Sequence, residues 1–307
     1  MLRSVLLSAS RSDKLRQVAT DAPPARAMVD RFVAGETAAD AVRATSELVA
    51  SGRLVTIDHL GEDTLDLAQA QATRDAYLEL LGALGEAGLT ASAEVSVKLS
   101  AVGQALPGDG EKIALENARA IAEKATALGT TVTLDMEDHT TTDSTLSVLR
   151  KLRGDFPTTG AVLQAYLYRT EADCRDLAHE GSRVRLCKGA YKEPASVALQ
   201  KMDDIRAAYK RQARLLLDQG HYPALATHDE SLIQDALQHV REKGYARERF
   251  EFQMLYGLRP KRWDALVREG WNVRIYVPYG THWFPYFYRR LRERKENVFF
   301  VLRGIFE

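Results

Sequence analysis

The segment from Tyr276 to Glu293 concentrates aromatic and cationic side chains. If it is helical, Tyr286, Arg289, Arg290 and Glu293 follow the spacing i, i+3, i+4, i+7 and share one helix face. Adjacent guanidiniums beside an aromatic ring suit a carboxylate ligand that carries apolar surface. The alternative is a solvated basic helix, with an Arg289–Glu293 pair worth roughly a few tenths of a kcal/mol. The aromatic density of the segment favours the binding site.

A second cationic segment runs from Arg185 through Lys188-Gly189-Ala190-Tyr191 to Pro194. Two inward cations followed by Gly-Ala would allow the backbone to approach an anionic cofactor closely. The alternative is a strand-to-loop turn with surface lysines. The order Gly-Lys-Ser/Thr that is typical of a P-loop is not present.

The run from Asp135 to His139 raises the question of a metal site, since carboxylates and a histidine could coordinate a divalent ion. We favour acids that cap the following helix over a metal, and we expect no metal in this protein. Thr227-His228-Asp229 allows the same two interpretations, and no His-x-His pair typical of metal-dependent hydrolases occurs.

Lys98, Gln164 and Tyr276 are single candidates and each is weak alone. An inward lysine near Arg289 and Arg290 would add a third cation for a carboxylate. The set is therefore more informative than its members.

These residues need a scaffold, and the pattern of apolar runs supplies one. Eight short runs predict strands: 53–58, 93–99, 130–136, 161–167, 183–188, 223–227, 249–255 and 272–278. Segments with helical spacing, such as 111–128 and 195–219, lie between them. Alternating strands and helices predict parallel pairing through right-handed crossovers, and eight units predict a (β/α)8 barrel of the TIM type. An open doubly wound sheet is the rival, weakened because no Gly-x-Gly-x-x-Gly follows a strand.

In a barrel, catalytic groups lie at the carboxyl ends of the strands, and the candidates above fall there. We expect residues 1–52 to form a helical extension and residues 53–307 the barrel. Thr37 is a candidate N-cap for a helix ending at Ala50, and Pro23-Pro24 should interrupt the extension.

The composition excludes several classes of protein. The 307 residues carry 42 basic and 42 acidic side chains, so the charge footprint of a general nucleic-acid binder is missing. Cys174 and Cys187 form neither a disulfide framework nor a CxxC zinc motif, and we expect reduced thiols in a cytoplasmic protein. No apolar run approaches the ~18 residues that span a bilayer, which leaves peripheral membrane contact open.

At these residues the chain resembles the proline dehydrogenase family, including the corresponding domain of bifunctional proline utilisation proteins. The matching segments are 97–99, 134–137, 163–166, 185–191, 227–228, 252–257 and 276–293, in the family's order. The Tyr-x-x-Arg-Arg helix and the Arg-x-x-Lys-Gly-Ala-Tyr segment are the specific ones. Because the second half of the bifunctional proteins is missing, the resemblance implies a monofunctional enzyme.

The resemblance implies a distorted barrel that holds FAD at its carboxyl end. Carried over residue by residue, it assigns the flavin to Met136, Gln164, Arg185, Lys188, Gly189, Ala190, Thr227 and His228. Arg289, Arg290 and Lys98 would bind the carboxylate of proline, while Asp135 and Tyr276 border it and Leu255, Tyr286 and Ala190 contact its ring. Asp135 and Arg185 would be the catalytic pair, and Glu62 would form a gate with Arg289.

The implied reaction is oxidation of L-proline to 1-pyrroline-5-carboxylate, by hydride transfer from proline C5 to flavin N5 and onward electron transfer to a membrane quinone. Two other functions remain in view. One is a metal-dependent hydrolase or an aldolase that uses Asp135–His139 or a Schiff-base Lys98. The other is a barrel without enzymatic activity that binds a small carboxylate through Arg289 and Arg290.

Overall fold

The computed structural model describes residues 23–62, 64–179 and 181–292. Two helices come first: α3 (Pro23–Phe32) and α4 (Ala38–Ala50). As expected, Thr37 caps α4, because its side chain accepts a hydrogen bond from Asp40 N while Asp40 reaches back to the Thr37 backbone. Helix α3 begins at Pro23, where proline fits a first turn, and the chain before it lies outside the described residues.

Eight strands and their helices then alternate along the chain. The strands are β1 (Leu54–His59), β2 (Ala93–Lys98), β3 (Val132–Asp135), β4 (Ala161–Gln164), β5 (Arg183–Cys187), β6 (Tyr222–Ala226), β7 (Glu251–Leu255) and β8 (Val273–Tyr279). The α-helices between them are α5 (Leu67–Glu86), α6 (Gly110–Ala127), α7 (Thr142–Arg153), α8 (Thr170–Leu177), α9 (Met202–Gln219), α10 (Glu230–Lys243) and α11 (Pro260–Arg268), and α12 (Trp283–Arg292) follows β8. Short 3-10 turns lie at η1 (Leu99–Val102) and η2 (Arg247–Arg249).

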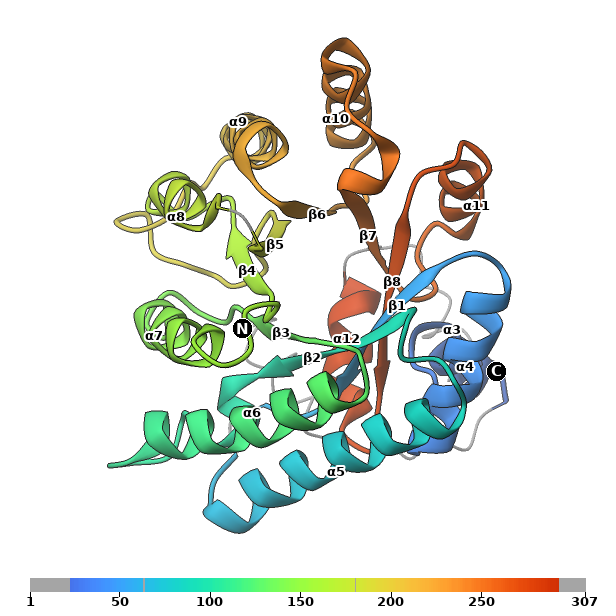
Figure 1. The fold of residues 1–307 in the computed structure, drawn as a ribbon, viewed down its shortest axis with the longest axis vertical. Helices are drawn as coiled ribbons and strands as arrows, with labels where there is room; N and C mark the ends of the chain where they lie inside the picture. Colours follow the sequence, from blue (N-terminus) through green and yellow to red (C-terminus); the bar gives the residue numbers. More distant parts are fainter. Residues whose placement is uncertain (1–22, 63, 180, 293–307) are drawn as a thin grey trace.

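All the strand pairs are parallel, in the order β3-β2-β1-β8-β7-β6-β5-β4. The ring closes between β3 and β4, where Leu134 N donates to Gly160 O at 2.9 Å and Gly160 N donates to Val132 O at 2.8 Å. Figure 1 shows the helices α5 to α11 arranged around the strands, with α12 inside the outline of that ring. The predicted (β/α)8 barrel is therefore confirmed, with a narrow contact at its β3–β4 junction.

Side chains alternate along each strand between the barrel interior and the surrounding helices, and this alternation determines which residues fill the interior. In β2, Val95 and Val97 face the helices and belong to the apolar core that the strands share with α5, α6 and their neighbours. The residues between them, Glu94, Ser96 and Lys98, bond to side chains of other strands across the interior. Successive strand residues point to opposite faces, so the apolar core lies outside the strands and the interior is largely polar.

One predicted helix was too long. We expected helical structure from residue 195, whereas α9 begins at Met202. The preceding chain instead bonds to the segment after β4: Leu199 N donates to Tyr166 O at 2.8 Å, and Leu167 bridges Ala198 in antiparallel fashion. Pairing with a distant segment has overridden the local helical spacing, which tertiary contacts regularly do. Four predicted strands were also too long, since Leu99, Ala165–Tyr166 and Arg249 lie in turns, and β3 spans only Val132–Asp135.

Candidate active site

Strands β1, β2, β3, β5 and β8 bring five charged or phenolic side chains together inside the barrel. Lys98 Nζ lies 2.6 Å from Asp58 Oδ2 and 3.6 Å from Asp135 Oδ2. Arg185 Nη1 lies 2.7 Å from Asp135 Oδ1, and the Tyr276 hydroxyl donates to Asp135 Oδ2 at 2.7 Å. We call this group (Asp58, Lys98, Asp135, Arg185 and Tyr276) the mouth cluster.

Asp135 is the centre of the mouth cluster. Burial alone would raise the pKa of its carboxyl, but the Arg185 and Lys98 cations and the hydrogen bonds from Tyr276 and Ser96 hold that pKa below its ordinary value. The Arg185 guanidinium also lies 5.4 Å from the Tyr276 ring centroid, a cation–π distance. Asp135 is thus an ionised acceptor that fixes the direction of Arg185.

Lys98 is protonated for the same physical reason. Burial acts to lower the pKa of its ammonium, yet Asp58 and Asp135 raise it above its ordinary value. Asp58 is 1% exposed and was missed by sequence reasoning. The signal available was its position: it is the penultimate residue of β1, Lys98 ends β2, and adjacent parallel strands bring the residues near their carboxyl ends together.

The cations of α12 lie beside the mouth cluster. Arg289 forms a bidentate ion pair with Glu62 of the segment after β1, with Nη2–Oε1 at 2.6 Å and Nη1–Oε2 at 3.2 Å. The Arg290 guanidinium lies 5.2 Å from the Tyr286 ring centroid. Glu293, the fourth residue of the predicted helix face, lies outside the described residues.

An apolar cluster holds α12 in place. Tyr286 and Leu255 belong to it together with Phe32, Leu60 and Trp283. Trp283 Nε1 also donates to Glu36 Oε1 at 2.9 Å, which ties α12 to the segment before α4. The N-terminal helices therefore help to position the arginine pair, a role that the sequence did not indicate.

The predicted cofactor residues occupy one arc of the mouth, at the ends of β3 to β6. They are Met136, Gln164, Arg185, Lys188, Gly189, Ala190, Thr227 and His228. Gln164 Nε2 donates to Glu137 O at 2.7 Å, and His228 Nε2 accepts from Leu255 N at 3.0 Å. Lys188 and Arg206 both pair with Asp229, at 3.3 and 2.8 Å. Most of the predicted substrate residues lie on the opposite arc, in β7, β8 and β2 and on α12, whereas Asp135 ends β3 and Ala190 follows β5, within the cofactor arc.

One feature of this arc suits a carbonyl-rich or anionic group. The glycine at position 189 is not that feature, because its φ of 110° and the adjacent Tyr166 ring, which a Cβ would meet, explain it by packing within the protein. Within the described residues, the buried Arg185 Nε has no hydrogen-bond partner. A donor without a partner in the interior fits a ligand that supplies an acceptor.

The residues of the alternative metal site make contacts with different parts of the protein. Asp135 points into the barrel, whereas His139 Nδ1 bonds to Glu193, which lies after β5. Asp138 accepts from Thr140 N at 2.9 Å in the turn before α7, but it does not cap the helix as we expected, because the N-cap residue is Thr141 and no side chain caps α7. Asp229, in contrast, caps α10 by accepting from Ser231 N. In the part of the chain described, no three metal-type side chains converge.

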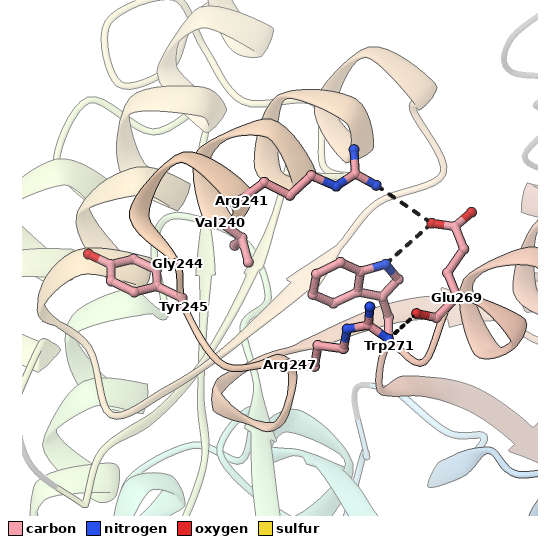
Figure 2. A pocket seen from close by; sticks show the side chains of 7 residues that line it. All are labelled: Val240, Arg241, Gly244, Tyr245, Arg247, Glu269 and Trp271. Carbon is pink, nitrogen blue, oxygen red and sulfur yellow. Dashed lines mark hydrogen bonds and ion pairs between the residues drawn. The ribbon is translucent and has the colours of Figure 1, made fainter.

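A hollow of about 480 Å³ lies at the other end of the barrel, beside the amino ends of β7 and β8. Figure 2 shows how its side chains bond to one another: Glu269 accepts from Trp271 Nε1 at 3.3 Å and pairs with Arg241 at 3.9 Å. Arg247 lies over the Trp271 ring, 5.2 Å from its centroid. The polar side chains that line this hollow therefore pair with one another. In a (β/α)8 barrel the active site is expected at the opposite, carboxyl end of the strands.

Comparisons with known proteins agree with one another. Residues 41–303 match the family described as proline dehydrogenase. The chain is 41% identical over 305 residues to proline dehydrogenase 1 of Bacillus subtilis, covering 99% of each protein. It is also 41% identical over 280 residues to proline dehydrogenase of Deinococcus radiodurans, covering 91% of this chain and 90% of that protein.

A solved structure matches the fold. Proline utilization A from Bdellovibrio bacteriovorus, inactivated by N-propargylglycine, superposes with a TM-score of 0.81 at 24% identity, over 94% of this chain and 38% of that one. In the described ranges, none of the helices has the length and apolar character needed to cross a membrane.

Proposed function

The chain belongs to the proline dehydrogenase family and acts in the first step of proline catabolism, and we propose that it oxidises L-proline to 1-pyrroline-5-carboxylate with bound FAD. The observation that carries the proposal is the division of the mouth. Cations suited to a carboxylate lie on the α12 side, the cofactor arc lies opposite, and the mouth cluster lies between them.

We assign the substrate carboxylate to Arg289, Arg290 and Lys98. Guanidiniums bind carboxylates through paired, charge-assisted hydrogen bonds, and a protonated Lys98 adds a third cation. Leu255, Tyr286 and Ala190 offer surface to the apolar ring, while Tyr276 and Asp135 border it. A substrate held at both its charged and its apolar ends is fixed in position, which is the main contribution a protein makes to hydride transfer.

The residues of the cofactor arc fit a flavin. Gln164 and Lys188 carry donors suited to ring carbonyls and phosphate oxygens, and Arg185 Nε is a buried donor without a partner in the described structure. When bound, the flavin supplies at N5 the acceptor for the hydride that leaves proline C5. Met136, Gly189, Ala190, Thr227 and His228 would line its site.

Arg185 and Asp135 have the catalytic roles in this proposal. Asp135, with Ser96 and Tyr276, holds the Arg185 guanidinium inside the barrel, where its positive charge favours negative charge developing nearby. Asp135 acts by orientation, since its own pKa is lowered and it stays ionised.

The Glu62–Arg289 pair would act as a gate. In the present arrangement the carboxylate of Glu62 occupies Arg289 in the way that a substrate carboxylate would. Substrate binding would then exchange one carboxylate for another at the same guanidinium, an exchange with a small net cost at this half-exposed position.

The aldolase alternative has less support. A Schiff-base lysine needs a lowered pKa, whereas two carboxylates raise that of Lys98. The electron acceptor that we propose is a quinone, reached by peripheral contact of this otherwise cytoplasmic enzyme with the membrane. Support for the quinone comes from the family resemblance alone.

The test is a visible spectrum of the purified protein followed by anaerobic addition of proline. We expect flavin absorption that bleaches with proline, which identifies the cofactor, the substrate and the reaction together. A yellow protein that proline does not bleach would overturn the substrate. A colourless protein that FAD cannot reconstitute would overturn the flavin.

A further inference from the structure

A line of alternating charges runs through the barrel interior from its amino end to the mouth cluster. Glu251 pairs with Arg274 at 2.7 Å, and Arg274 lies 3.8 Å from Glu94. Glu94 Oε1 in turn lies 3.8 Å from Arg185 Nη2. We call Glu94, Arg183, Glu251 and Arg274 the floor cluster. Glu94 is thus the floor residue that meets the proposed catalytic arginine from below.

Glu94 is shared by three guanidiniums. Besides Arg274 and Arg185, it pairs with Arg183 Nη2 at 2.6 Å, and it accepts a hydrogen bond from Thr133 Oγ1 at 3.2 Å. Burial alone would raise the pKa of its carboxyl, but the Arg183, Arg274 and Arg185 charges together hold it below its ordinary value. Glu94 therefore carries a full negative charge in the interior.

The surroundings do not screen this charge. Glu94, Glu251, Arg274 and Arg185 are all at most 6% exposed. The cavity beside Glu94 and Arg185, which Arg183 also lines, measures about 10 Å³, close to the room that one water needs. Charges act over longer distances in such an interior than at the surface, where salt and water weaken them.

We propose that Glu94 is a positioning residue for Arg185, and that its negative charge tempers the positive field which Arg185 presents to the flavin. The inference rests on the proposed function, because it concerns the cofactor that Arg185 would face. Glu94 itself reaches Arg185 and not the mouth, so it would act only through that arginine.

The sign of the effect follows from the charges. Replacing Glu94 by glutamine leaves Arg185 less compensated, which stabilises the anionic reduced flavin and makes its midpoint potential more positive. Replacing Arg183 by glutamine removes a cation that offsets the charge of Glu94. The carboxylate of Glu94 then compensates Arg185 more fully, so the midpoint potential of the flavin becomes more negative. The second shift should be smaller, because the Arg183 side chain is 24% exposed and partly screened.

The experiment is a redox titration of the flavin-loaded protein at fixed pH in wild type, E94Q, R183Q and the double variant. At a fixed ambient potential, we expect E94Q to raise the ratio of reduced to oxidised flavin by roughly tenfold. R183Q should lower that ratio by less, and the double variant should return close to wild type. Glu111→Gln is the matched control, since it removes a carboxylate that pairs with Lys151 on the outer surface and should shift nothing.

A charge effect shifts the flavin midpoint potential in opposite directions in E94Q and R183Q. A general loss of structure would shift the potential of both variants in the same direction. An unshifted E94Q, or shifts of the same sign, would overturn the inference. If E94Q does not fold, R183Q and the charge-balanced double variant still test it, and an unshifted R183Q would then overturn it. A wild-type protein without flavin contradicts the proposed function instead.

Discussion

The floor cluster and the Glu62–Arg289 pair on the rim of the mouth are built from the same kinds of side chain, yet they differ in exposure to solvent. In the floor, Glu251 is fully buried, pairs with Arg274 and also accepts from Tyr222 at 3.0 Å. Near the mouth, the Arg289–Glu62 pair is 43% and 34% exposed. Buried pairs cannot exchange partners without a large desolvation penalty, whereas exposed pairs can. The floor should therefore govern stability, and the mouth should govern binding.

The largest effect should come from breaking the floor. Glu251→Gln leaves Arg274 with a buried charge that has lost its closest partner, which should lower the free energy of unfolding by about 3–5 kcal/mol. Chemical denaturation measures this loss, and the KM for proline should stay near that of wild type. A stable variant with an impaired KM would reverse the roles of the floor cluster and the rim of the mouth.

The rim of the mouth should contribute to stability in a pH-dependent way. His59 ends β1 between the rings of Tyr77 and Tyr279, and burial, aided by His282 and Lys98, lowers its pKa to about 4. In the unfolded chain its pKa is about 6.5, so between these values the unfolded state binds a proton that the native state does not. Stability from His59 is complete above the upper value and is lost as pH falls towards 4, by at most about 3 kcal/mol.

Unfolding free energies measured from pH 7.5 down to pH 4.5 should show this slope. His59→Gln removes the ionisation, and its stability should depend less on pH over the same window. If both proteins lose stability in parallel, His59 is not the source of the slope.

Substrate binding should be most sensitive to substitutions in α12. Arg290→Met removes a charged donor from the proposed carboxylate site and should raise the KM for proline about 10- to 100-fold, the equivalent of one charge-assisted hydrogen bond. The flavin spectrum should not change, and neither should the free energy of unfolding by more than about 1 kcal/mol. Arg268→Met, on the exposed end of α11, is the matched control and should leave KM unchanged.

The same site should bind tetrahydrofuran-2-carboxylate, which keeps the ring and the acid but lacks the oxidisable amine. It should compete with proline in the wild type, and Arg290→Met should weaken its inhibition in the same proportion as it raises KM. Inhibition that the substitution does not affect would contradict the carboxylate assignment.

The smallest effect should come from outside the floor cluster and the mouth. Thr37→Ala removes the N-cap of α4 and should cost about 1 kcal/mol of stability, seen as a fall in Tm of roughly 1–2 °C. Proline KM and flavin potential should not move. A change in either would mean that the segment tied to α12 through Glu36 and Trp283 controls the mouth more strongly than the ion pairs suggest.

Local patterns in the amino-acid sequence determine much of this architecture. Apolar runs of strand length alternating with helical spacing predicted the eight strands and the barrel, because periodicity depends only on which face a residue must bury. The motif segments also predicted which strand ends carry the candidate residues, because chain order alone fixes those ends in a barrel. The proposed roles of those residues are still to be tested.

Only the tertiary structure determines which charged side chains pair with one another inside the barrel. Lys98 was assigned to the substrate carboxylate by the resemblance, and the register of β1 against β2 gives it a further partner that the sequence did not indicate, Asp58, forty positions away. Glu94 and Arg274 drew no attention in the sequence, since an isolated charge in a strand does not reveal what lies across the barrel. Asp135 and His139 looked like one cluster, yet successive residues leave a strand end in different directions. Local pattern determines which face a side chain takes, and only the closed barrel determines which charge it meets there.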